Sequence, residues 1–166
     1  MASIKRALPQ RRLFKRTVAG VFDTLDWLEE RLARQPYLVS DELTEADIRL
    51  FTTLVRFDPV YYGHFKCNRR ALVDYPALWD YTRALYQHPD IRPTVNFDHI
   101  KGHYYGSHPW LNPSGIVPIG PQRDFDMPVA ECRRYRTAQS SQVPGDLGPL
   151  KVSIVGDPPA ARRGAI

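Results

Sequence analysis

The chain has 166 residues, of which 43% are hydrophobic and 25% charged, so it can bury one core, and we expect a single folded domain rather than a disordered chain. The sequence has no run of about 18 apolar residues and no apolar N-terminal segment, so it predicts neither a membrane span nor a secretory signal. We therefore expect a cytoplasmic protein with no membrane partner. The net charge is +5, but residues 1–16 hold six basic residues and no acidic one, so the remainder is close to neutral and nucleic acid is not an expected partner.

The first predicted element is an amphipathic helix that ends before Pro36. Its apolar residues recur at alternating spacings of four and three and therefore share one stripe: Phe14, Val18, Val21, Leu25, Leu28 and Leu32. We expect this stripe to face the core.

A second helix is expected to start at Thr44, because Asp47 stands three residues later and can complete a capping box. Apolar residues lie nearly all round this helix, so we expect it to be central and buried. The dipeptide Asp58-Pro59 is expected to end or kink it.

Two more helices follow. One begins at Tyr75-Pro76, and the next runs from Phe97 to Gly106. From Pro109 onward no helical stripe or convincing strand is seen, and nine of the fifteen prolines fall there, which predicts an irregular or disordered tail. The sequence therefore predicts an all-α fold of about four or five helices.

Histidines and cysteines are the first candidates for chemistry. His99 and His103 are four residues apart, which suits two metal ligands on one helix face, but a third ligand is not evident and ordinary surface histidines are the favoured interpretation. His64 near Cys67 admits a Cys/His nucleophile, although a buried structural thiol is commoner. The second cysteine, Cys132, is assigned no role, and the absence of a CxxC argues against a zinc ribbon or a disulfide scaffold.

Two tyrosine doublets stand near predicted helix ends. They are Tyr61-Tyr62 and Tyr104-Tyr105. A phenol can stack on a flat ring and hydrogen-bond a hydroxyl or carbonyl, so two phenols in one pocket would suit an aromatic diol or quinone. From the residues alone, boundary aromatics with solvated hydroxyls are the commoner interpretation.

Several long runs of sequence resemble one family in the same order. They include the stretch from Leu43 to Tyr61 and further segments at 63–69, 74–79, 94–101, 103–108 and 112–121. Over residues 11–121 the chain resembles the C-terminal domain of the glutathionyl-hydroquinone reductases, which are xi-class, omega-like glutathione transferases. The resemblance implies a glutathione S-transferase C-terminal-type helical bundle.

The resemblance also implies a function. In this family a thioredoxin-like N-terminal domain binds glutathione, which is the co-substrate, and carries a nucleophilic cysteine in a Cys-Pro context. The helical domain shapes the pocket for the quinone or hydroquinone. By motif, the tyrosines that hold the hydroquinone oxygens correspond to Tyr61 and Tyr104. No metal is implied.

The chain also departs from the family. Cys67 is followed by asparagine and Cys132 by arginine, so the Cys-Pro motif of the nucleophile is missing and no catalytic residue is assigned. We expect an unmatched basic head at 1–10, a helical domain at 11–121, an irregular or disordered tail at 122–166, and no thioredoxin-like domain.

Two functions follow from these expectations. The first is a partial enzyme of the family that acts with a separate thioredoxin-like domain, and the second is a non-catalytic module that mediates interaction or homodimer formation. A thioredoxin-like segment with a Cys-Pro motif encoded immediately upstream would favour the first.

Overall fold

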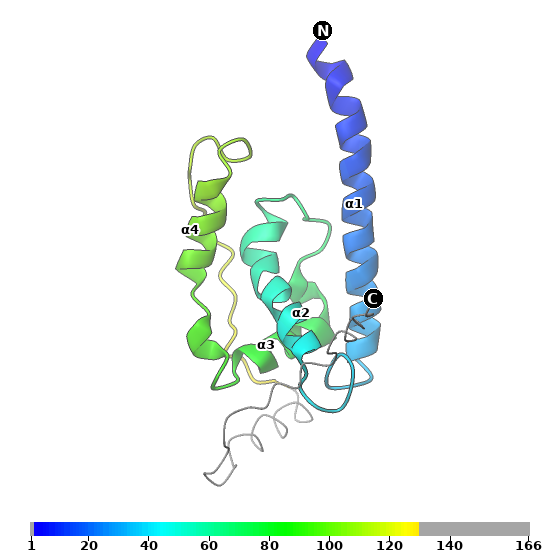
Figure 1. The fold of residues 1–166 in the computed structure, drawn as a ribbon, viewed down its shortest axis with the longest axis vertical. Coiled ribbons are helices and arrows are strands. Elements are labelled where there is room, and N and C mark those ends of the chain that lie inside the picture. Colours follow the sequence, from blue (N-terminus) through cyan, green and yellow to red (C-terminus); the bar gives the residue numbers. More distant parts are fainter. Residues whose placement is uncertain (1, 130–166) are drawn as a thin grey trace, which may run out of the picture.

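The computed structural model describes residues 2–129, and every regular element in this part is a helix, as predicted. Four α-helices carry the fold, joined by one π-helical and two 3-10 segments (Figure 1). In chain order they are α1 (Ala2–Leu32), α2 (Glu45–Arg56), η1 (Phe57–Tyr62), η2 (Leu72–Asp74), α3 (Pro76–Tyr86), η3 (Arg92–Thr94) and α4 (Phe97–Ser107).

The long helix α1 confirms the C-terminal half of the first predicted stripe. Leu25, Leu28 and Leu32 are buried, and so is Phe22, which the stripe did not include. The expectation is wrong for Phe14, which is 45% exposed. In Figure 1 the N-terminal part of α1 extends past the other helices. The helix is continuous from Ala2, with no break at residue 10.

The capping box predicted at the start of α2 is present. The backbone N–H and the hydroxyl of Thr44 donate to Asp47 Oδ2 at 2.9 and 2.7 Å. Asp47 is fully buried, and its Oδ1 also accepts from the backbone N–H of Leu38 at 2.7 Å and from the hydroxyl of Tyr81 at 2.9 Å. One carboxylate thus joins the loop before α2, the start of α2 and α3.

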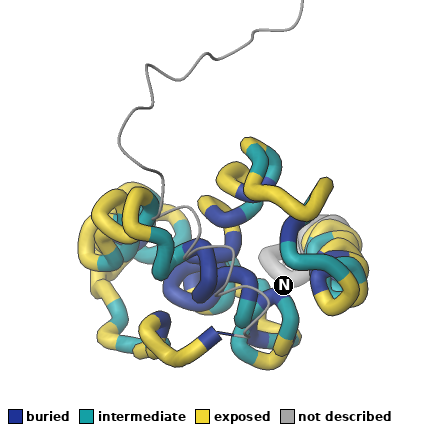
Figure 2. The backbone as a smooth tube through the Cα atoms, turned by 90° about the horizontal axis from the view of Figure 1, so that it is seen from below, coloured by how far each residue is buried: buried dark blue, intermediate teal, exposed yellow. Residues whose placement is uncertain are grey.

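Helix α2 buries Phe51, Leu54 and Val55, and the buried stretches of the chain, drawn dark blue in Figure 2, lie in the middle of the bundle. The expectation that it is buried all round is wrong, because Ile48 is 38% exposed and Thr53 is also exposed. The two residues lie on different faces of α2. Ile48 lines a pocket together with residues of η3 and α4, and Thr53 lines an open groove between α2 and α1.

At Asp58-Pro59 the α-helix gives way to a helix of a different type. The α-helix ends at Arg56 and a π-helical segment continues to Tyr62. Proline has no N–H to donate and clashes with an α-helical turn, which explains why the winding changes here. Buried Asp58 accepts from the backbone N–H of Leu72 at 2.7 Å and from Arg123 Nε at 2.8 Å, which holds the segment in place.

Between α4 and residue 129 the chain is irregular, and its last residues pack against the helices. The side chain of Phe125 is 6% exposed and sits among the rings of Trp79, Tyr86 and Phe97, at centroid distances of 4.9, 4.9 and 5.0 Å. Gln87 donates to the backbone carbonyls of residues 125 and 127 at 2.8 Å each. Residues 122–129 thus belong to the packed body, and the rest of the predicted tail, 130–166, lies outside the described residues.

None of the helices in the described part is long and apolar enough to cross a membrane.

Candidate functional site

A groove with a volume of about 540 Å³ lies between α1 and α2 and reaches η1 and α4. The α1 wall is made by Val21, Leu25 and Leu28, and the α2 wall by Leu50 and Leu54. On each helix these residues follow a spacing of three or four, so each wall is an apolar stripe. This cavity suits the hydrophobic part of a small molecule.

We call this cavity the tyrosine groove. Thr24 and Thr53 also stand in its helical walls, and the rest of its lining is Phe57, Tyr61, Phe65, Cys67 and Tyr104. The rings of Tyr61 and Tyr104 lie 6.0 Å apart at 83°, an edge-to-face contact. Two tyrosines that are far apart in the sequence, and that motif resemblance singled out, are therefore neighbours in one pocket.

The hydroxyl of Tyr61 is held in its protonated form. Burial, a hydrogen bond with Tyr104 and a charge interaction with Tyr104 together raise the pKa of Tyr61 to about 12, against a smaller opposing effect of Arg56. At neutral pH this phenol is uncharged, so it can donate a hydrogen bond to an oxygen acceptor.

The second tyrosine of each doublet, Tyr62 or Tyr105, does not line the tyrosine groove. Tyr105 is 9% exposed and packs against the ring of His64 at 4.6 Å. Burial raises the pKa of Tyr105, although a hydrogen bond with the backbone of His64 acts in the opposite direction. Tyr62 is half-buried and is not among the residues that line the groove. One tyrosine of each doublet therefore faces the pocket, and Tyr105 is a core residue.

Cys67 lines the groove, but its thiol is not activated. Burial raises the pKa of Cys67, which lowers the fraction of reactive thiolate. The neighbouring His64 does not serve it as a base, because its Nε2 lies 3.0 Å from Nδ1 of His108. The geometry gives no support to a Cys67–His64 nucleophile, and Cys132 lies outside the described residues.

The histidines of α4 do not form a metal site in the structure. His99 and His103 are both exposed. Across residues 2–129 there is no group of three or more His, Cys, Asp or Glu side chains placed to hold a metal ion.

Sequence reasoning missed the pairing of His64 with His108. It compared only residues that are close in sequence, namely His99 with His103 and His64 with Cys67. The two rings stack at a centroid distance of 5.2 Å, and 44 positions separate them in the chain. A contact of this kind leaves no local pattern from which it could be found.

Comparisons with known proteins identify the family of the helical domain. Residues 12–84 match the family described as glutathione S-transferase, C-terminal domain. The chain is 61% identical over 101 residues to glutathionyl-hydroquinone reductase PcpF of Sphingobium chlorophenolicum, a match that covers 61% of this chain and 32% of that protein. It is 53% identical over 122 residues to glutathionyl-hydroquinone reductase YqjG of Escherichia coli, covering 74% of this chain and 37% of the relative.

Solved structures give the same result. The glutathione-bound structure of YqjG from Escherichia coli matches with a TM-score of 0.70 and 52% identity, over 74% of this chain and 39% of that one. The glutathione-S-transferase Xi from Phanerochaete chrysosporium matches with a TM-score of 0.64 and 52% identity, over 68% and 36%. The chain spans about a third of the length of the curated relatives it matches.

Proposed function

We propose a function from the premise that the helical domain of this chain belongs to the glutathione S-transferase family, as a C-terminal domain related to the glutathionyl-hydroquinone reductases. The proposal is that the tyrosine groove binds the ring of a hydroquinone or quinone during glutathione-dependent reduction of a glutathionyl-hydroquinone. Tyr61 and Tyr104 are the residues that hold its oxygens.

One observation carries the proposal: the two phenols meet in a pocket that is otherwise mostly apolar. Aliphatic walls on α1 and α2 can cover the faces of a flat ring, and the phenols can hydrogen-bond its oxygens. The protonated state of Tyr61 supports the same role, because a neutral phenol donates where a phenolate could not.

The sulfur chemistry belongs to groups outside these 166 residues. A cysteine thiolate would form a disulfide bond with the glutathione sulfur while the bond from that sulfur to the ring carbon breaks. The electron pair passes to the ring carbon, which takes up a proton, and a second glutathione then releases glutathione disulfide. Neither Cys67 nor Cys132 precedes a proline. We therefore propose that a thioredoxin-like domain supplies both the thiolate and the glutathione site.

Binding can be tested on the 166-residue chain with 1,4-naphthohydroquinone under argon, followed by tryptophan fluorescence. Tyr61→Phe and Tyr104→Phe should each weaken binding about 2- to 10-fold, the loss expected for one hydrogen bond. Tyr62→Phe, the neighbour outside the groove, is the matched control and should bind as the unchanged chain does. Saturable binding that neither groove variant weakens would refute the role of the phenols, and no saturable binding would refute the site.

A second candidate function is the non-catalytic interaction module. The segment after α4 favours it, because Trp110, Ile116 and Ile119 are 77%, 69% and 87% exposed. Large apolar side chains exposed to this degree are candidates for an association surface. Light scattering at increasing concentration should detect self-association that Ile119→Asp reduces. A strictly monomeric chain at high concentration would contradict this alternative.

A further inference from the structure

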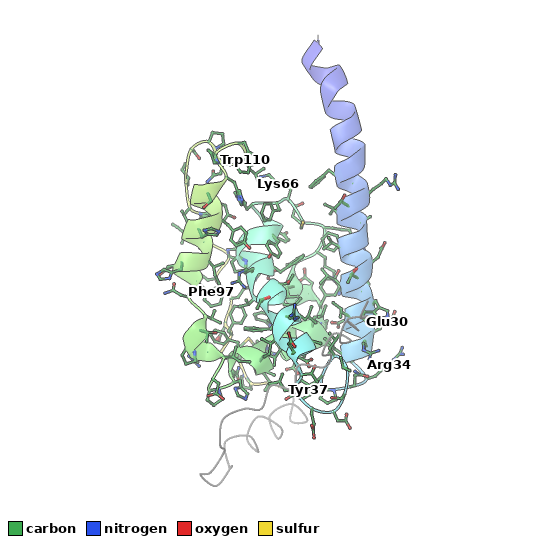
Figure 3. The ribbon with its side chains drawn as sticks, viewed as in Figure 1. Glu30, Arg34, Tyr37, Lys66, Phe97 and Trp110 are labelled. Carbon is green, nitrogen blue, oxygen red and sulfur yellow. The ribbon has the colours of Figure 1, made fainter. Side chains whose placement is uncertain are left out.

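The loop after η1 brings a buried histidine to the end of α4. His64 is 2% exposed, and its Nε2 lies 3.0 Å from Nδ1 of His108, the residue that caps the C-terminus of α4. In Figure 3 the labels of Lys66 and Trp110 mark this same end of the molecule, where the loop meets the segment after α4. One hydrogen bond therefore connects two elements that are distant in sequence.

Both connected elements contribute to the tyrosine groove. The loop carries Phe65 and Cys67 into its lining, and α4 carries Tyr104. The ring of Phe65 touches Tyr61, Tyr104 and His108, with centroid distances of 5.7, 5.9 and 5.6 Å. A displacement of His64 from His108 would move Phe65 and separate the two sides of the groove.

We propose that the His64–His108 hydrogen bond is a clasp that positions Tyr61 against Tyr104, and that double protonation of the pair opens it, so that ligand affinity falls in acid. This inference rests on the proposed function of the groove and adds its regulation. The two histidines act on the ligand through the tyrosines and are positioning residues.

The charge states of the pair explain the direction. Between two neutral imidazoles, one ring N–H donates to the lone pair of the other, and a single added proton can still be shared between them. With a second proton both facing nitrogens become donors and two cations stand about 3 Å apart, so the bond is lost. The clasp therefore opens when the pair binds its second proton.

The surroundings resist protonation of His64. Burial, the charge of His108 and the charge of Lys66 together hold the pKa of His64 below its ordinary value of 6.5. Lys66 Nζ donates to the backbone carbonyl of His64 at 2.7 Å, so its ammonium stays close. From α4 the other titratable groups nearby are Tyr104, Tyr105 and His103, whose ring contacts Tyr104 at 5.4 Å. Opening is therefore expected on the acid side of pH 6.5.

The test measures binding of 1,4-naphthohydroquinone between pH 8 and pH 5, where the ligand phenols remain un-ionised. The unchanged chain should lose at least about fivefold in affinity toward pH 5. His108→Ala should bind more weakly at every pH, with a flat profile. His108→Asn should restore affinity and remain flat, because an amide oxygen can accept from His64 Nε2 and does not titrate. His99→Ala, an exposed histidine of the same helix, is the matched control and should keep the unchanged profile.

A second measurement separates failure of the clasp from failure of the binding site. Amide hydrogen exchange of residues 63–67 in the ligand-free chain at pH 7.5 should be faster in His108→Ala than in the unchanged chain and near normal in His108→Asn. If the ligand binds through the tyrosines but the acid profile is the same in all variants, the clasp is wrong and the binding site stands. If neither the unchanged chain nor any variant binds the ligand, the proposed binding site is wrong. Equal amide hydrogen exchange in the unchanged chain, His108→Ala and His108→Asn would overturn the clasp independently of ligand binding.

Discussion

The hydroxyl of Tyr81 on α3 donates a hydrogen bond to Asp47 Oδ1 at 2.9 Å, so the residue that caps α2 also anchors a second helix. Asp47 is fully buried and accepts further hydrogen bonds from Leu38 and Thr44. A carboxylate taken out of water is tolerated only when donors surround it, and here the donors come from three segments. The support of the groove wall on α2 depends on this arrangement.

Replacing Asp47 should therefore destabilise the whole domain. Asp47→Ala removes the carboxylate that accepts from Leu38, Thr44 and Tyr81, and we expect a loss of about 3 kcal/mol or more in the free energy of unfolding. Urea denaturation followed by circular dichroism measures it. Glu45→Ala, in the first turn of the same helix but solvent-exposed, should change stability by less than about 0.5 kcal/mol. Equal effects of the two substitutions would contradict the role given to Asp47.

The raised pKa of Tyr61 predicts a loss of stability in alkali. The pKa of Tyr61 is about 12 in the folded chain and near 10 in the unfolded chain. Between pH 10 and pH 12 the folded state therefore holds the phenol proton more tightly than the unfolded state does. The stabilisation is complete below pH 10 and is lost as the pH rises toward 12. Unfolding midpoints measured between pH 9 and pH 12 should fall less steeply in Tyr61→Phe than in the unchanged chain. Tyr62→Phe serves as the control, and parallel slopes in the two variants would count against burial as the cause.

The segment after α4 should contribute to stability through Phe125. Its ring is 6% exposed among Trp79, Tyr86 and Phe97, so Phe125→Ala leaves a cavity and should cost about 3–5 kcal/mol. Met127 is two residues away and 48% exposed, and its replacement by alanine should cost within about 0.5 kcal/mol. Thermal denaturation of both variants checks this. A small effect of Phe125→Ala would mean that residues 122–129 do not belong to the packed body.

The absence of a Cys-Pro dipeptide from these residues predicts that the 166-residue chain alone does not turn over a glutathionyl-hydroquinone in the presence of glutathione. The half-buried thiol of Cys67, with its raised pKa, is a poor nucleophile for this reaction. Release of hydroquinone can be followed by liquid chromatography under argon. Turnover that Cys67→Ser abolishes would show that the nucleophile lies in this chain and would overturn the proposed division of roles.

Much of the helical architecture could be predicted from the sequence, because its signals are local. The apolar stripe of α1, the capping box of Thr44 and Asp47 and the proline that opens α3 each depend on residues within a few positions of one another. The π-helical segment was not predicted in that form, because Asp58-Pro59 indicates an interruption without specifying which winding replaces the α-helix. The exposed face of α2 was also missed, since periodicity shows which residues are apolar and not which neighbour covers them.

For the candidate site, too, some features could be predicted from the sequence and others could not. The sequence by itself determined the helices and, through family motifs, singled out Tyr61 and Tyr104. Only the tertiary structure decided that their rings meet, that Tyr105 turns into the core, and that His64 pairs with His108. The physical reason is distance along the chain: caps and stripes are set by neighbouring residues, whereas these contacts exist only after α1, α2 and α4 have packed and excluded water from between them.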